Sequence, residues 1–239
     1  MRLIIIKFVF LILIFSLFSC SARINGSINA NGSAVLSVNM SLEPGISALI
    51  QRLSNAGGQA GIILDAPSIT RGMSEAPGIS SASFRNISPS SMEGQVNISR
   101  IDDFLASAGS ERNTQNTFIV FEQGQRGGRC VININRNNGP EILDLLSPEI
   151  SDYLNALMAP IATGEEMTKR EYLELVTSFY NRVISDEISS SRIRAAIDFP
   201  GTISNIRGGT FSGRRASFDI PLLDLLVLET PLIYEVTWN

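Results

Sequence analysis

The sequence predicts an α+β protein of one domain, in which an antiparallel sheet built from hairpins carries two longer amphipathic helices on one face. Residues alternate between apolar and polar, as in strands, soon after residue 20 and again over residues 193–238. Between these regions, apolar residues recur at helical spacing. The chain has no long linker and no repeat, so residues 20–239 are predicted to form a single folded domain.

The first elements are read from alternation and from turn residues. Apolar residues alternate with polar ones over residues 34–40, after a turn that follows an earlier strand near residues 24–28. Pro44 marks a helix start, and Gly57 with Gly58 marks its end. The segment 65–94, rich in Ser, Pro and Gly, is predicted to be a loop with one strand. A strand at 96–98, a helical turn at 102–105 and a hairpin of 118–122 with 129–135 follow.

The central segment predicts the two longer helices. In the first, apolar residues recur from Ile142 to Leu157, with Pro148 restarting the helix. In the second, Thr168 and Glu171 form a capping box before an apolar stripe that runs to Val183. The C-terminal part returns to strands, interrupted by a brief helix over residues 221–226.

Residues 1–19 have the layout of a secretion signal. Arg2 and Lys7 bracket a short positive region, and residues 8–18 carry no charge. An apolar run of about 11 residues spans only about 16 Å as a helix, roughly half of the hydrocarbon core, so it is too short for a comfortable transmembrane helix. We therefore expect residues 1–19 to be a signal peptide.

The residues before Cys20 decide the kind of signal. Leu17, Phe18 and Ser19 precede it, and this segment resembles the bacterial lipobox, which has an aliphatic residue at minus three, a small residue at minus one and an obligatory Cys at plus one. Phe18, at minus two, is bulkier than the residue usual there. The resemblance implies cleavage before Cys20 and lipidation of its sulfur with diacylglycerol, with palmitate-like chains that anchor the protein durably. The alternative is a buried or disulfide-bonded Cys20.

Cysteine count and charge narrow the class of protein further. With Cys20 acylated, Cys130 has no partner for an internal disulfide, and it is either a small core hydrophobe in a strand or a reactive thiol.

The charge of the mature chain is acidic, because loss of Arg2 and Lys7 from 19 basic residues leaves 17 against 23 acidic residues. This acidic balance disfavours nucleic acid as a partner.

The residue types present argue against an enzyme. The chain contains no histidine, which excludes Ser-His and Cys-His nucleophile pairs and imidazole metal sites. After cleavage, Lys169 is the sole lysine, in an exposed first helical turn. Paired acids remain as the alternative for glycoside hydrolysis: Asp102 with Asp103, Glu165 with Glu166, or Glu171 with Glu174. We expect a non-catalytic protein that uses no cofactor and no metal.

Four segments carry a further resemblance: residues 25–42, 199–201, 208–213 and 218–225 look like the opening and closing signatures of LppM-type bacterial lipoproteins. The resemblance covers about a quarter of the chain and rests on hairpins. It implies a tethered α+β ectodomain with a concave face that engages lipids or glycolipids, and it implies no catalytic residues. Several relatives have a C-terminal transmembrane helix, which we do not expect in residues 20–239 of this chain.

A binding module is the predicted function of the ectodomain. Side chains of the two longer helices are predicted to roof a cavity for a lipid or other apolar envelope ligand: Tyr153, Met158, Tyr172, Phe179 and Tyr180. The alternatives are a dry core beneath these helices, and a structural or assembly role with an envelope protein partner. The lipid anchor places the protein at the cell membrane or the outer membrane, on the exported side. Ser21 and Ala22 lack the Asp at plus two that marks retention in the inner membrane in some bacteria.

Arginines gather in glycine-rich places. Arg126 and Arg129 flank one such turn, and Arg207, Arg214 and Arg215 flank another. These segments are predicted to be hairpin turns with solvated arginines. The alternative is that their tips touch lipid phosphates or anionic glycans.

Overall fold

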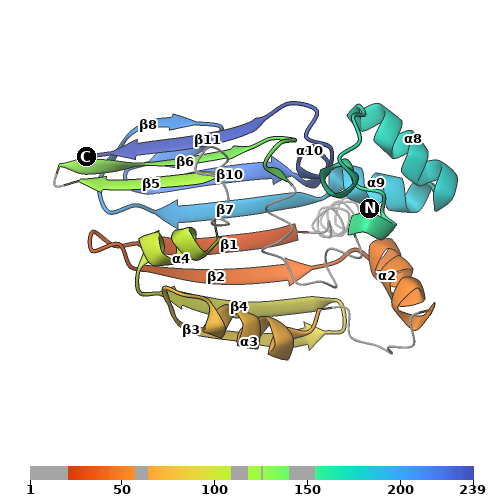
Figure 1. Ribbon diagram of the computed structural model, residues 1–239, viewed down its shortest axis with the longest axis horizontal. Coiled ribbons are helices and arrows are strands. Elements are labelled where there is room, and N and C mark those ends of the chain that lie inside the picture. Colours follow the sequence, from red (N-terminus) through yellow and green to blue (C-terminus); the bar gives the residue numbers. More distant parts are fainter. Residues whose placement is uncertain (1–20, 57–63, 109–117, 125, 140–153) are drawn as a thin grey trace, which may run out of the picture.

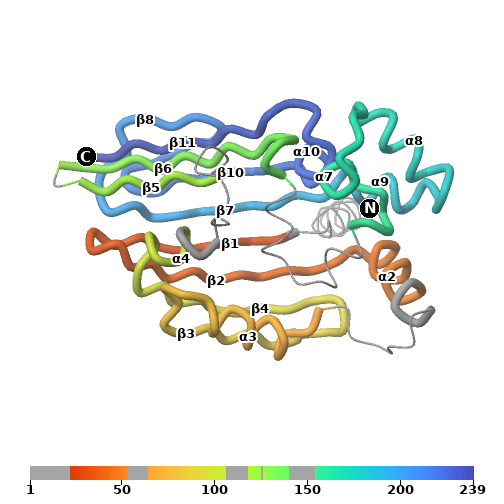
Figure 2. The backbone as a smooth tube through the Cα atoms, in the orientation of Figure 1, coloured from red at the N-terminus to blue at the C-terminus, as the bar shows by residue number. Residues whose placement is uncertain are grey.

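Two packed β-sheets and a group of helices at one end of the strands make up the protein (Figures 1 and 2). The computed structural model describes residues 21–56, 64–108, 118–124, 126–139 and 154–239. The predicted α+β class and single domain are confirmed, with the strands divided between two sheets.

Sheet A is the larger sheet, and in the described chain it has seven strands. Their order is β3 (Ile79–Ser88), β4 (Ser91–Ile98), β2 (Ala34–Ser41), β1 (Ser21–Ile28), β7 (Arg192–Asp198), β10 (Arg215–Pro221) and β9 (Thr210–Ser212). Sheet B has the order β5 (Ile119–Gly124), β6 (Gly127–Ile134), β11 (Leu232–Trp238) and β8 (Ile203–Arg207). The hairpins predicted at 24–40 and 118–135 are β1–β2 and β5–β6.

A parallel pair at the centre of sheet A joins the first strand of the described chain to a strand in its C-terminal third. Ser21 of β1 lies opposite Arg192 of β7, and Ser27 lies opposite Asp198. The other described strand pairs are antiparallel, as predicted. A parallel pair needs a crossover connection, which here runs through most of the chain. No local pattern in the sequence reveals such a pairing.

The helices mostly lie beyond the strand ends, at the end where β1 begins (Figure 1). They are α2 (Pro44–Ala56), α7 (Pro160–Thr163), α8 (Lys169–Phe179), α9 (Arg182–Ser190) and α10 (Leu222–Val227). Two further helices, α3 (Ala66–Glu75) and α4 (Ile101–Ala108), pack near β3 and β5. In the described chain no helix is both long enough and apolar enough to cross a bilayer.

Three apolar clusters hold these layers together. The first joins α2, α8, α9 and α10 to one end of sheet B, and the second joins the two sheets around Trp238. The third lies between the inner face of sheet A and α4. A side-chain contact also ties distant helices together, because the Glu187 carboxylate of α9 accepts hydrogen bonds from Gly45 N at 2.9 Å and Ile46 N at 2.7 Å in the first turn of α2.

The second long helix differs from the predicted one because it is broken in two. The capping box of Thr168 with Glu171 starts α8 as expected. However, α8 ends at Phe179, and the Asn181 side chain accepts a hydrogen bond from Ile184 N at 3.1 Å and so caps α9. An asparagine side chain that satisfies a free backbone N–H favours a new helix start over continuation. Phe179 and Val183 are therefore exposed, at 66% and 58%.

The segment 65–94 holds more structure than predicted. Asp65 caps α3 through Ser68 N, and Pro67 occupies its first turn. Strands β3 and β4 then form a hairpin. The prediction of a loop with one strand was wrong. Apolar residues are too sparse in this segment to indicate a helix by their spacing, and the start of α3 is instead specified by its capping residues.

Candidate functional site

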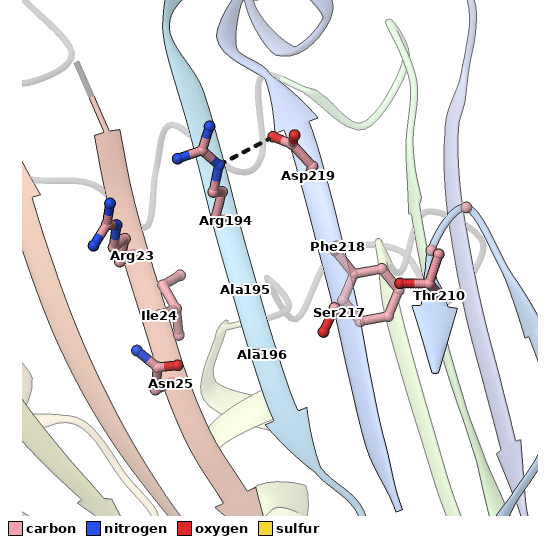
Figure 3. A pocket seen from close by; sticks show the side chains of 12 residues that line it. Arg23, Ile24, Asn25, Arg194, Ala195, Ala196, Thr210, Ser217, Phe218 and Asp219 are labelled. Carbon is pink, nitrogen blue, oxygen red and sulfur yellow. Dashed lines mark ion pairs between the residues drawn. The ribbon is translucent and has the colours of Figure 1, made fainter. Parts of the chain in front are cut away.

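A shallow groove of about 680 Å³ crosses the outer face of sheet A (Figure 3). Its floor is formed by β1, β7 and β10, and its rim is the turn of residues 208–210 that follows β8. Ile197 of β7 and Phe218 of β10 pack against the core between the sheets. Because successive side chains of a strand point to opposite faces, Arg194 and Asp219 lie on the outer face of sheet A.

The register arranges the groove in rows across three strands. Each row takes one residue from β1, β7 and β10: Arg23–Arg194–Asp219, then Asn25–Ala196–Ser217, then Ser27–Asp198–Arg215. We call these the arginine row, the alanine row and the closing row. The arginine row is nearest the start of β1 and the closing row is nearest the β9–β10 turn.

The arginine row carries positive charge that the fold balances poorly. Arg23 lies directly opposite Arg194 on the neighbouring strand. Arg194 Nε is 3.8 Å from Asp219 Oδ1, and both side chains are about half exposed. Arg23 makes no ion pair within the described part of the chain. Like charges at directly opposed strand positions are destabilising, so the folded sheet gains nothing from this pairing.

The closing row, in contrast, is internally balanced. Arg215 Nη1 lies 2.9 Å from Asp198 Oδ2, and its Nη2 donates to Asn25 Oδ1 at 3.3 Å. The guanidinium of Arg215 is therefore committed to partners in the protein. The excess positive charge of the groove is concentrated in the arginine row.

The alanine row forms a low point between the other two. Ala196 has only a methyl group, and it lies between Asn25 and Ser217. Thr210 pairs with Ser217 and brings a second hydroxyl to the rim. A Cβ at Gly209 would lie 2.6 Å from the Ser217 carbonyl oxygen, so glycine allows the rim to approach β10 closely. The result is a small polar recess beside two arginines.

The charge of the three strands contrasts with that of the chain. Four arginines and two aspartates are present on β1, β7 and β10, and all point to the outer face: Arg23, Arg192, Arg194, Arg215, Asp198 and Asp219. This face therefore has two positive charges in excess, whereas the whole chain has a formal net charge of −4.

The residues predicted to line a cavity beneath the helices lie in different environments. Tyr172 is fully buried in the first core cluster, where its hydroxyl donates to the Leu157 carbonyl at 3.3 Å. Burial raises the pKa of Tyr172. The half-buried Tyr180 donates to the Ala156 carbonyl. Phe179 is exposed at the last residue of α8, and Met158 lies in a left-handed turn with φ of 52°. None of these residues lines the groove.

Two predicted site residues, Cys20 and Tyr153, lie outside the described residues. The other cysteine, Cys130, lies partly buried in the cluster around Trp238, and burial raises the pKa of its thiol to about 11. In the described residues no group of three or more acidic or thiol side chains is placed to hold a metal ion.

The glycine-rich arginine segments lie at different places. Arg126 is at the β5–β6 turn, at the end of the strands opposite to the helices (Figure 1). The segment after Arg207 forms the rim of the groove, and Arg215 belongs to the closing row. Arg23 and Arg194 were not predicted as site residues. The sequence shows that Arg23 alternates with Asn25, and Arg192 with Arg194, along their strands. It does not show that β1 pairs with β7.

Comparisons with known proteins give one weak structural likeness. No family model matches the chain, and a comparison with curated proteins finds no match. Among solved structures, the chain is similar to the NMR structure of the Mycobacterium tuberculosis LppM (Rv2171) protein folded domain. The two are 8% identical, with a TM-score of 0.40 over 93% of this chain and 92% of that one. So low a score is a similarity in outline, and no property of that domain is transferred from it.

Proposed function

We propose that this chain is an exported lipoprotein, tethered to a bacterial envelope membrane through acyl chains on Cys20, whose domain is a non-catalytic binding module. The observation that carries the proposal is the lipobox-like segment from Leu17 to Cys20, which ends immediately before the first residue of β1. The absence of histidine from the chain supports the non-catalytic part.

The position of β1 supports a tether at Cys20. Ser21 pairs with Ser41 on one side and with Arg192 on the other, in the middle of sheet A. An anchor on the preceding residue would therefore be joined to the most central strand of the sheet without a linker. Such a short connection restricts how far the domain can tilt or move away from the membrane.

This tether gives the molecule a membrane-proximal end and a distal end. The helices and the arginine row lie at the end where β1 begins (Figure 1). The closing row lies four residues, or about 13 Å, further along the strands, at about 3.3 Å per residue. The β5–β6 turn with Arg126 lies at the distal end, so these tips point away from the membrane that holds the anchor.

Replacement of each cysteine in turn tests the tether. In a bacterial host fed with labelled palmitate, the wild-type chain and Cys130→Ser are expected to incorporate label and to lose residues 1–19. Cys20→Ser is expected to incorporate no label and to keep residues 1–19, because processing requires the acylated cysteine in a lipobox signal. Mass spectrometry of the N-terminal peptide checks both. Label on Cys20→Ser would contradict the proposal.

An assembly role with an envelope protein is the second candidate, favoured by the exposed apolar corner between α8 and α9. Phe179 and Val183 are 66% and 58% exposed there, a pair of large apolar side chains left in solvent. A photo-crosslinking residue at position 183, activated in cells, distinguishes the assembly role from the binding module. One stoichiometric protein adduct supports the assembly role, and lipid adducts alone exclude it.

A further inference from the structure

The geometry points to the arginine row as a binding site for a phosphate group, with Arg23 and Arg194 as its two charged donors. The Arg guanidinium is planar and always charged, and it presents paired N–H donors that match phosphate oxygens. Two guanidiniums on adjacent strand positions can hold one phosphate between them. Figure 3 shows both side chains directed to the same side of the sheet.

The electrostatics favour an anion over a neutral ligand. Asp219 is the single carboxylate of the row, and its contact with Arg194 is long at 3.8 Å. A bound phosphate would relieve the repulsion between the two arginines, which the closing row avoids because Arg215 is paired with Asp198 at 2.9 Å. The arginine row has two positive charges and one negative charge, so a negatively charged ligand would balance it.

The alanine row supplies the space and the neutral donors. The methyl group of Ala196 leaves a recess next to the arginines, and the hydroxyls of Ser217 and Thr210 lie along its edge. Hydroxyls can donate to phosphate oxygens that the guanidiniums leave free. A larger side chain at position 196 would fill this recess without entering the core, because position 196 is on the outer face.

The source of the phosphate follows from the proposed function, on which this part of the inference rests. Arg23 is three residues after Cys20, and Arg192 is paired with the residue that follows Cys20. An acyl anchor would place these guanidiniums at the depth of lipid headgroups, where basic side chains bind anionic lipids. The ligand is therefore inferred to be the phosphate of an anionic lipid headgroup.

The test uses the mature protein purified from bacterial membranes in a neutral detergent. It is titrated with short-chain phosphatidylglycerol, short-chain phosphatidylcholine and inorganic phosphate, and binding is followed by calorimetry. The variants are Arg23→Gln/Arg194→Gln and Ala196→Leu. The matched control is Arg85→Gln, which removes an exposed arginine of β3 from the same face of sheet A.

Saturable binding of phosphatidylglycerol, weakened about tenfold or more in the double variant and in Ala196→Leu but unchanged in Arg85→Gln, is the expected result. If inorganic phosphate binds as tightly as phosphatidylglycerol, the site is supported and its ligand is a free anion. Equal binding of phosphatidylcholine, or wild-type affinity in the double variant, would overturn the site. Thermal unfolding by circular dichroism confirms that each variant is folded, and the mass of the N-terminal peptide reports acylation separately.

Discussion

Single side chains in this protein have roles that depend on their strand neighbours. Arg23 and Arg215 are both exposed arginines of sheet A, yet Arg215 is paired with Asp198 and Arg23 has no ion pair within the described residues. Cys130 likewise takes its properties from the cluster around Trp238. The sequence left open whether this thiol is a core residue or a reactive one, and its burial argues for the core.

The thiol of Cys130 is expected to be unreactive in the folded protein. Burial disfavours the thiolate and raises the pKa from 9.0 to about 11, so at about pH 8 alkylation should be roughly 100-fold slower than for an exposed cysteine. Labelling with iodoacetamide, followed by mass spectrometry, measures the rate. In concentrated urea the same residue should react like a free thiol, which is the internal control. Rapid labelling of the folded protein would show that the thiol is accessible.

The same residue predicts a loss of stability in alkali. The folded pKa of Cys130 is raised above its value of 9.0 in an unfolded chain. Between these values the unfolded state loses the proton and the folded state keeps it, so the free energy of unfolding falls as pH rises from about 9 to about 11. Urea unfolding over this range checks the direction. Cys130→Ala should show a smaller decline, although buried tyrosines such as Tyr172 contribute in the same direction at higher pH.

At the scale of elements, helix ends are the best specified parts of the chain. The capping box at Thr168 and the start of α2 at Pro44 were predicted from their residues and are confirmed. The break between α8 and α9 was not predicted, because an apolar stripe continues through Phe179 to Val183 in the sequence. The cap made by Asn181 decides the break, and it leaves two apolar side chains exposed that a continuous helix was expected to bury.

The contact between α9 and α2 predicts a large effect from one carboxylate. Glu187 satisfies two backbone N–H groups in the first turn of α2, in a part-buried position. Glu187→Ala should lower the free energy of unfolding by about 2 to 3 kcal/mol, since charge-assisted hydrogen bonds are lost and two donors are left without a partner. Urea denaturation measures the change. Glu174→Ala, which removes only an exposed contact with Arg170, should cost less than about 0.5 kcal/mol. Equal costs would contradict this role.

At the scale of the whole molecule, the parallel pairing of β1 with β7 ties the beginning of the domain to its C-terminal third. The two sheets share the cluster around Trp238, and Phe218 belongs both to that cluster and to the one beneath the helices. The layers are therefore not independent units.

The domain is accordingly expected to unfold in one cooperative transition. Fluorescence of Trp238, the sole tryptophan, reports on sheet B, and circular dichroism reports on all strands and helices. Their urea midpoints should coincide. Val236→Ala, at a position 2% exposed, should lower both midpoints together and cost about 2 kcal/mol. A fluorescence change that precedes the dichroism change would show that sheet B unfolds separately.

The sequence by itself determined the α+β class, the hairpins, the capped helix starts and the expectation of an acylated Cys20, because alternation, capping and processing signals are local properties of the chain. Only the tertiary structure decided that the strands form two sheets, that β1 lies beside β7, and that Tyr172 is buried while Phe179 is exposed. Arg23 and Arg194 became neighbours through that one pairing. Pairing of distant strands is set by the packing of whole layers, for which short stretches of sequence carry no signal.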